Sequence, residues 1–274
     1  MESGGVRTEP PAGWYPDPLH PDVLMQFDGR RWTGARVIRA AVPPPPRGTL
    51  PARVAVWAVL CTALPLVVGR TVMYLLAHFR WPIAAYIAVG GAIAYSPGLL
   101  LWWQVGRRHM RRHSRDAVGF RARWIDLAWG PGTWLAAVCA EVLVGSLLVA
   151  LRVPFVSNTD SFGDVHGRRG YVVALLLLAV LVAPIAEEVI FRGLLLRGLL
   201  SQIPPWAAIT VQAVLFGAAH VAPERGWGNI GLALVLASVG AVFGAAAYLS
   251  RRLAPSIIAH AMVNGIALAI VFSR

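Results

Sequence analysis

Apolar residues in this chain come in long blocks rather than in the narrow stripes of soluble helices. Two of them are YVVALLLLAVLVAP at 171–184 and NIGLALVLASVGAVFGAAAYL at 229–249. Such blocks approach the roughly 20 residues that a membrane-spanning helix needs. They lack the period-two alternation of a barrel strand, and a helix satisfies its own backbone in hydrocarbon. The pattern therefore predicts an all-α, polytopic bundle of transmembrane helices.

Seven apolar blocks are candidate spans within a transmembrane domain that we place at 53–274. They cover residues 54–69, 83–105, 132–152, 171–193, 206–222, 229–249 and 255–272. The stretch at 71–82 is ambiguous, because it can extend the first span or lie at the membrane interface. We therefore expect about seven spans.

Composition and charge support a membrane protein. The chain is 57% hydrophobic and only 14% charged, which is less charge than a soluble domain of 274 residues carries. Its net charge of +12 comes from arginines between the apolar blocks, whereas a DNA-binding face interleaves basic residues with folded soluble sequence. We therefore expect membrane lipid as a partner and no nucleic acid.

The basic loops predict an orientation in the cell membrane. Seven arginines lie between Arg107 and Arg123, and the positive-inside rule puts such a loop in the cytoplasm. The N-terminus is then cytoplasmic and, with an odd number of spans, the C-terminal tail lies outside. Arg197 and the Arg251–Arg252 pair also fall inside. The pair Arg168–Arg169 falls outside, which counts against this orientation.

The first residues predict a separate unit. Between residues 10 and 37, two tryptophans bracket Tyr15, Phe27 and an Asp28-Gly29 turn signal, which favours a small β-rich aromatic domain with a marginal core. A linker at 38–52 follows and contains the four prolines 43–46. Consecutive prolines form an extended spacer, and a ligand for a proline-recognition domain is the alternative.

This N-terminal segment resembles a short domain of unknown function that begins many actinobacterial membrane proteins. The shared pattern is G-W-Y-x-D-P followed by D-G-x-x-W-T. It stands here as Gly13, Trp14, Tyr15, Asp17, Pro18, Asp28, Gly29, Trp32 and Thr33. The resemblance implies an actinobacterial source but no activity. Binding of an unknown protein partner and a role as an inert cap both remain open.

Ionisable residues inside spans cost roughly 2.5–3.5 kcal/mol each, so each one is a hypothesis of function. The C-terminal half carries several: Glu187, Glu188, Arg192, His220 and His260, with the polar Asn264. Glu188 precedes Arg192 by four residues, the favourable order for a helical ion pair. That pair neutralises Glu188 and leaves Glu187 available. The alternative is two carboxylates that reach water at a helix end.

Spacing predicts that the histidines approach Glu187. Pro204 and Pro205 mark a turn between two helices, and Glu187 and His220 lie at similar distances before and after it. Phe216 shares the helix face of His220 and can pack on its imidazole. In the last block, His260 and Asn264 are four apart and share a face. The asparagine can orient the imidazole, stabilise an oxyanion, or form only a weak interhelical hydrogen bond.

This set of groups suits hydrolysis of an amide by activated water, with Glu187 as general base. A metal version is also open, because two imidazoles and a carboxylate match catalytic zinc ligation. Its candidate ligands are Glu187, His220 and His260. The H-E-x-x-H signature is absent, as is the G-x-S-x-G elbow of a serine mechanism. A further in-span carboxylate, Glu141, is left without a role.

The three motifs resemble those of the CAAX-protease and bacteriocin-processing family of intramembrane proteases. Glu187-Glu188-x-x-x-Arg192 is similar to its E-E-x-x-x-R motif, Phe216-x-x-x-His220 to F-x-x-x-H, and His260-x-x-x-Asn264 to H-x-x-x-N. They stand in the family order, within a core at about 130–272. The resemblance implies a membrane-embedded protease that acts on a membrane-associated peptide or protein.

The resemblance also implies roles for the individual residues. Glu187 and His220 activate the water, His260 and Asn264 line the oxyanion side, and Glu188 and Arg192 hold the site together. The family is often labelled as metalloproteases, although a metal-free glutamate mechanism fits these residues better. Two alternatives stay open: a non-catalytic scaffold or bacteriocin-immunity protein that keeps the polar site, and a transporter that uses the carboxylates as a proton relay.

Overall fold

The computed structural model describes residues 12–20, 23–38, 50–109, 118–157, 159 and 169–273. The chain divides into two compact units, Met1–Arg47 and Gly48–Arg274. Each unit has its own secondary structure, all β in the first and all helical in the second.

The N-terminal unit is a three-stranded antiparallel sheet in the order β1-β2-β3, made of Gly13–Pro16, Val23–Phe27 and Trp32–Ile38. Asp28 makes the predicted turn, since its carboxylate accepts the N–H groups of Arg30 and Arg31, and Gly29 adopts a φ of 94°. Trp32 packs on the buried Phe27 and edge-on against Tyr15. The small aromatic sheet predicted from the sequence is confirmed.

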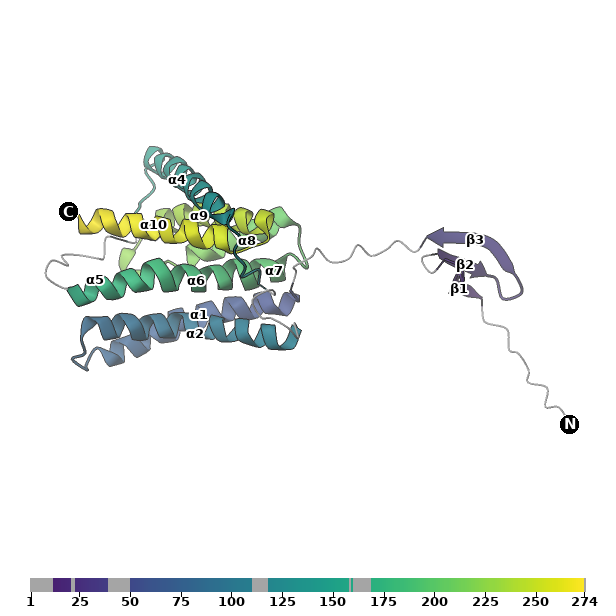
Figure 1. Ribbon diagram of the computed structural model, residues 1–274, viewed down its shortest axis with the longest axis horizontal. Helices are drawn as coiled ribbons and strands as arrows, with labels where there is room; N and C mark the ends of the chain where they lie inside the picture. The colour runs from purple at the N-terminus through teal and green to yellow at the C-terminus, as the bar shows by residue number, and fades with distance from the viewer. Residues whose placement is uncertain are drawn as a thin grey trace. The chain divides into compact units, whose positions relative to one another are not determined.

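The second unit is a helical bundle (Figure 1). It contains α1 (Ala52–Leu76), α2 (Ile83–His109), α4 (Asp126–Ala150), α8 (Pro205–Ala218), the short η3 (Pro223–Arg225), α9 (Gly228–Ser250) and α10 (Ala254–Phe272). Between α4 and α8 lies one continuous composite helix of five parts: α5 (Arg169–Leu176), η1 (Leu177–Val182), α6 (Ala183–Glu187), η2 (Glu188–Leu195) and α7 (Leu196–Leu199). In Figure 1 this composite helix runs through the middle, with α1 and α2 on one side and α8, α9 and α10 on the other.

Six helices in the described part of the chain are long and apolar enough to cross a membrane. Exposed apolar side chains on α4, such as Leu127 and Val149, face outward as lipid-contacting residues do. The protein is therefore a multi-pass membrane protein. The ambiguous stretch after residue 70 extends the first span, because α1 continues to Leu76.

The predicted span 206–222 is wrong in its length. Its helix, α8, has 14 residues, or about 21 Å, and falls short of the roughly 30 Å of bilayer hydrocarbon. It ends at Ala218, before Pro223 and the positive-φ Gly226, which do not continue a helix. The sequence pattern predicts that His220 lies on a helix, and this prediction is wrong. His220 lies in the turn after α8.

The basic segments gather at one end of the bundle. The N–H of Leu50, just before α1, donates to the Arg197 carbonyl, and the Arg197 guanidinium donates to the Arg251 carbonyl. At the same end, Arg252 pairs with Asp126 at the start of α4 (2.5 Å). The predicted clustering of the Arg197, Arg251 and Arg252 segments is present.

Candidate active site

Two adjacent glutamates lie where the composite helix changes its hydrogen-bond pattern. Glu187 ends α6, and Glu188 begins the π-helical η2. Both side chains are buried. Short π-helical stretches are uncommon and occur frequently at functional sites, where they redirect side chains. The two carboxylates accordingly have different partners.

Glu188 is neutralised by the predicted ion pair. Its Oε1 accepts from Arg192 Nη1 (2.7 Å) and from His260 Nδ1 (3.2 Å), and both Glu188 and Arg192 are fully buried. Arg192 Nη2 also donates to the Gly240 carbonyl of α9 (3.2 Å). Glu188 Oε2 and Arg192 Nε have no hydrogen-bond partner among the described residues. These contacts tie η2 to α9 and α10, and we call them the Glu188 arm.

Glu187 faces the two imidazoles. Its Oε1 accepts a hydrogen bond from the Tyr95 hydroxyl (2.7 Å). Its Oε2 is buried, lacks a hydrogen-bond partner in the described part of the chain, and lies 3.8 Å from Nε2 of both His220 and His260. We call Glu187 with these three partners the Glu187 arm. One carboxylate oxygen thus lies at the same distance from two ring nitrogens.

Both imidazoles are held from behind by their Nδ1 atoms. His220 Nδ1 lies 2.8 Å from the Phe216 carbonyl, and a carbonyl only accepts, so Nδ1 carries a hydrogen. His260 Nδ1 likewise donates to the Glu188 carboxylate. In the neutral form of each ring, the lone pair is then on Nε2 and faces Glu187 Oε2. This arrangement presents two bases and a carboxylate to the same small volume.

Phe216 lies at the centre of the aromatic packing around the site. Its ring contacts His220 (centroids 4.8 Å apart), as predicted, and meets His260 edge-on (5.9 Å). The Arg192 guanidinium carbon lies 4.4 Å from the same ring centroid, within cation–π range. Phe216 therefore orders both histidines and shields the ion pair from solvent.

The turn that carries His220 is anchored by its neighbours. Asn229 accepts from the N–H of Ala222 (2.9 Å) and donates to its carbonyl (2.7 Å), and Arg225 donates to the His220 carbonyl. Glu224 pairs with Arg70 of α1 (2.9 Å). Hydrogen bonding to its own backbone N–H, together with Arg70, lowers the pKa of Glu224 from its usual value. These contacts hold the non-helical backbone between α8 and α9 in place.

Asn264 lies one turn after His260, but its described hydrogen bond goes elsewhere. Its amide donates to the Ala179 carbonyl in η1 (2.8 Å). In that π-helical stretch Ala183 donates to Leu178, so the next donor in the pattern belongs to residue 184. Residue 184 is a proline and has no N–H. Asn264 thus supplies the donor that Pro184 lacks, whatever else its side chain does.

Sequence reasoning missed Tyr95, the donor to Glu187 Oε1. It comes from α2, well before the motifs that mark the site. A usable signal was present: Gly91, Tyr95 and Gly98 are spaced four and three apart, so two small residues flank a polar one on one helix face. A polar side chain on a small-residue face predicts close contact with another helix.

Glu141, to which the sequence pattern assigned no role, is exposed on α4. It lines a cavity of about 390 Å³ together with Asn264 and Ala179. Within the described residues it forms no hydrogen bond or ion pair with His220 or His260. The structure thus gives it no place behind either imidazole.

The metal alternative is tested by the same distances. Ligands of a tetrahedral zinc lie roughly 3.4 Å apart, given Zn–N and Zn–O bonds of about 2.1 Å. Glu187 Oε2 is 3.8 Å from each Nε2, and no three His, Cys, Asp or Glu side chains in the described residues form a metal-holding group. The donor types suit zinc, but this arrangement does not fit it.

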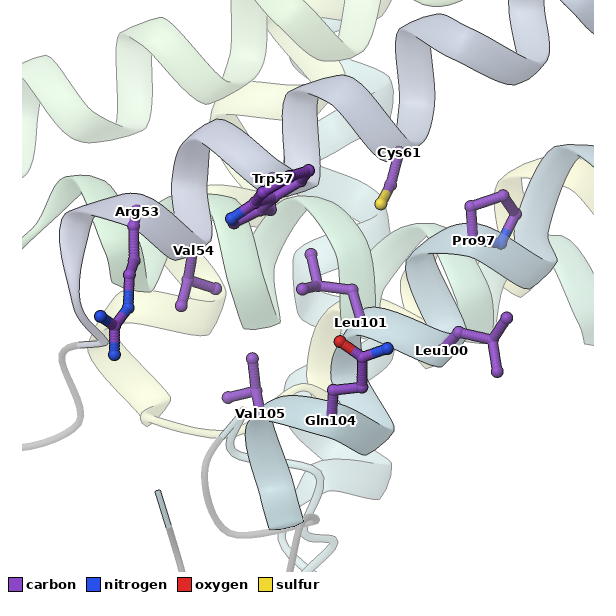
Figure 2. A pocket seen from close by; sticks show the side chains of 9 residues that line it. All are labelled: Arg53, Val54, Trp57, Cys61, Pro97, Leu100, Leu101, Gln104 and Val105. Carbon is purple, nitrogen blue, oxygen red and sulfur yellow. The ribbon is translucent and has the colours of Figure 1, made fainter. Parts of the chain in front are cut away.

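Two further cavities flank the bundle. One of about 210 Å³ lies between α1, η2 and α8, and its lining includes Phe191 and Ala219, the neighbour of His220. Another, of about 520 Å³, lies between α1 and α2, with Arg53 and Trp57 on one helix and Leu100 and Gln104 on the other (Figure 2). This second cavity shares no lining residue with the polar site.

Comparison with known families agrees with this geometry. Residues 169–266 match the model for Type II CAAX prenyl endopeptidase Rce1-like proteins, and residues 12–47 match a protein family of unknown function, DUF2510. No curated protein and no solved structure matches the chain. Both resemblances predicted from the motifs are thereby confirmed. The segment 169–266, which carries Glu187, His220 and His260, is therefore similar to Rce1-like type II CAAX prenyl endopeptidases, and the segment 12–47 is similar to DUF2510.

Proposed function

We propose that the protein is an intramembrane endopeptidase that cleaves a membrane-associated peptide or protein with water activated by Glu187 and His220. One observation carries the proposal: the buried Glu187 Oε2 lies 3.8 Å from the Nε2 atoms of both His220 and His260. A base, two further proton-handling groups and shelter from bulk water are what hydrolysis of an amide requires.

The chain's own residues account for each proton. A water between the three groups donates one hydrogen to Glu187 Oε2 and the other to His220 Nε2. Glu187 takes its proton as the oxygen attacks the scissile carbonyl, and then passes that proton to the leaving amine. His220 keeps the attacking lone pair in line, because the Phe216 carbonyl holds its ring.

The developing oxyanion faces the α10 side of the site. His260 donates from Nδ1 to Glu188, and in its imidazolium form it can also donate from Nε2 to the oxyanion. Asn264 uses one amide hydrogen on the Ala179 carbonyl and keeps a second for the oxyanion. Glu188 and Arg192 hold His260 in place from behind. These roles are parts of the proposal.

The surroundings support a substrate that arrives from the membrane. The cavity beside Phe191 and Ala219 is lined largely by apolar side chains of α1, η2 and α8. Such a lining suits an apolar side chain or lipid-like group of the substrate. The basic end, with Arg197 and Arg251, supports an orientation in the cell membrane with the N-terminus in the cytoplasm. An actinobacterial source stays a prediction from the N-terminal motif.

The test compares wild type, Glu187→Gln and His220→Ala, purified in detergent, on a library of membrane-anchored peptides. Glu141→Gln is the matched control, because it neutralises an in-span carboxylate outside the site. Loss of a general base predicts a fall in kcat of about 10²- to 10⁴-fold for Glu187→Gln, with the control unchanged. A chelator arm should leave the wild-type rate unaltered.

The other outcomes are informative as well. Equal cleavage by all four proteins overturns the site assignment. If folded wild type cleaves no peptide and the cellular phenotype survives both site substitutions, the scaffold or immunity alternative replaces the protease. Loss of activity on chelation with recovery on adding zinc would instead require a metal at Glu187, His220 and His260.

A further inference from the structure

The donor to the proposed catalytic base comes from a helix outside the matched family segment. The Tyr95 hydroxyl on α2 lies 2.7 Å from Glu187 Oε1. We propose that Tyr95 is the positioning residue of Glu187: its hydroxyl holds Oε1, so that Oε2 is the oxygen that faces both imidazoles. This inference rests on the proposed function of Glu187 and adds a residue to it.

A carboxylate needs such an anchor because rotation about its terminal bond is broad and roughly two-fold. Three side chains approach Glu187 from different parts of the bundle: Tyr95 from α2, His220 from the turn after α8, and His260 from α10. At 3.8 Å the two imidazoles lie beyond hydrogen-bond distance. The Tyr95 hydrogen bond is therefore the directional contact that distinguishes Oε1 from Oε2 within the described residues.

The close packing of α2 on the composite helix brings the phenol within reach. A Cβ on Gly91 would lie 2.6 Å from Leu178 Cδ1, and one on Gly98 would lie 2.4 Å from Ile190 Cδ1. Small residues let membrane helices approach closely, and these two flank Tyr95 on one face of α2. Tyr95 thus lies between two close contacts of α2 with the composite helix, and any movement of α2 away from that helix would lose this packing.

A positioning role has a kinetic signature. Tyr95 touches the base rather than the proposed water or substrate, so its loss should lower kcat and leave KM unchanged. Misorientation of a base, or loss of a hydrogen bond to a charged group, predicts a decrease of about 10- to 100-fold for Tyr95→Phe. Tyr86→Phe is the matched control, because Tyr86 is on the same helix and its hydroxyl binds the Leu76 carbonyl.

A double-mutant cycle tests whether Tyr95 acts through Glu187. In the Glu187→Gln background, the residual rate should not fall further when Tyr95→Phe is added. A fall of the same size in both backgrounds would overturn the inference, as would an equal loss of kcat in Tyr86→Phe. A rise in KM at unchanged kcat would place Tyr95 in substrate binding instead, and would also overturn it.

A second readout needs no substrate. The infrared difference spectrum of wild type minus Glu187→Gln isolates the carboxylate bands of Glu187. Tyr95→Phe should shift those bands, and Tyr86→Phe should leave them in place. Unshifted bands overturn the inference even if wild type is an active protease. If the bands shift but wild type cleaves no peptide, the hydrogen bond from Tyr95 to Glu187 is supported and only the proposed function is contradicted.

Discussion

Two neighbouring glutamates in one helix have opposite surroundings. In the Glu188 arm, the carboxylate meets a fully buried arginine at 2.7 Å, and that arginine also binds the Gly240 carbonyl. In the Glu187 arm, the carboxylate has a neutral phenol on one oxygen and two imidazoles 3.8 Å from the other. The side chain of His220 keeps 26% of its surface exposed, whereas Arg192 keeps none.

The difference shows how one sequence motif divides its work. A buried charge with a close counter-ion is fixed in place and adds little reactivity, and removal of the counter-ion is strongly destabilising. A buried carboxylate without a paired cation contributes less to the fold and remains able to accept a proton. We infer that Glu188 serves mainly the fold and Glu187 mainly the chemistry. Substitutions that separate stability from activity test this division.

The largest expected effect on stability follows from breaking the Glu188 arm. Arg192→Ala leaves the fully buried Glu188 without its counter-ion, so the free energy of unfolding should fall by about 3–5 kcal/mol. Unfolding by sodium dodecyl sulfate from mild detergent, followed by tryptophan fluorescence, measures this change. Arg192→Lys keeps the charge but not the geometry for Gly240, and should lose less.

A matched control for that measurement is Arg80→Ala, since Arg80 is exposed in the connection between α1 and α2 and lies outside the polar site. It should leave the free energy of unfolding within about 0.5 kcal/mol of wild type. If Arg192→Ala is no more destabilising than Arg80→Ala, the assignment of Glu188 and Arg192 to the fold is wrong.

Much of this arrangement could be predicted from the sequence. Long apolar blocks gave the positions of the helices, because in hydrocarbon the length of a helix is tied to the thickness of the bilayer. The spacing of Glu188 and Arg192 predicted their ion pair, since the fourth residue along a helix shares its face. The Pro204–Pro205 turn predicted the depth match of Glu187 and His220, and their side chains lie 3.8 Å apart.

Other features depend on tertiary structure that local patterns do not encode. Tyr95 approaches Glu187 because Gly91 and Gly98 let α2 pack closely, and sequence spacing does not reveal which helix pairs with which. The early end of α8 follows from the turn that Asn229 anchors, and the apolar block at 206–222 gives no sign of this turn. The bond from Asn264 to Ala179 needs a π-helical stretch before a proline, and hydrophobic periodicity carries no signal for that register.

A smaller effect on stability is expected at the Glu187 arm. Glu187→Gln keeps an acceptor for Tyr95 and removes a buried charge that lacks a close cation, so the free energy of unfolding should stay within about 1 kcal/mol of wild type. The same detergent titration measures it. A loss comparable to that of Arg192→Ala would show that the fold needs both arms. It would contradict the inference that Glu188 serves mainly the fold and Glu187 mainly the chemistry.

The smallest effect concerns the amide that supports the site from α10. Asn264→Ala removes the donor to the Ala179 carbonyl, and interhelical hydrogen bonds in membranes contribute about 0.6 kcal/mol on average. Pro184→Ala restores an N–H at residue 184, which can donate to that carbonyl within the helix. The double variant Pro184→Ala/Asn264→Ala should therefore regain the stability that Asn264→Ala loses.

Activity in the same double variant then separates two roles of Asn264. If its second amide hydrogen stabilises the oxyanion, kcat should stay about 10²- to 10³-fold below wild type although stability has returned. If instead both stability and kcat recover together, Asn264 only supplies the donor that Pro184 lacks, and the oxyanion must rely on His260. Pro184→Ala alone is the control, because it keeps Asn264 and should retain the wild-type rate if the register of η1 is unchanged. These variants of Pro184 and Asn264 thus test whether Asn264 takes part in catalysis or only supplies the hydrogen bond to the Ala179 carbonyl that Pro184 cannot donate.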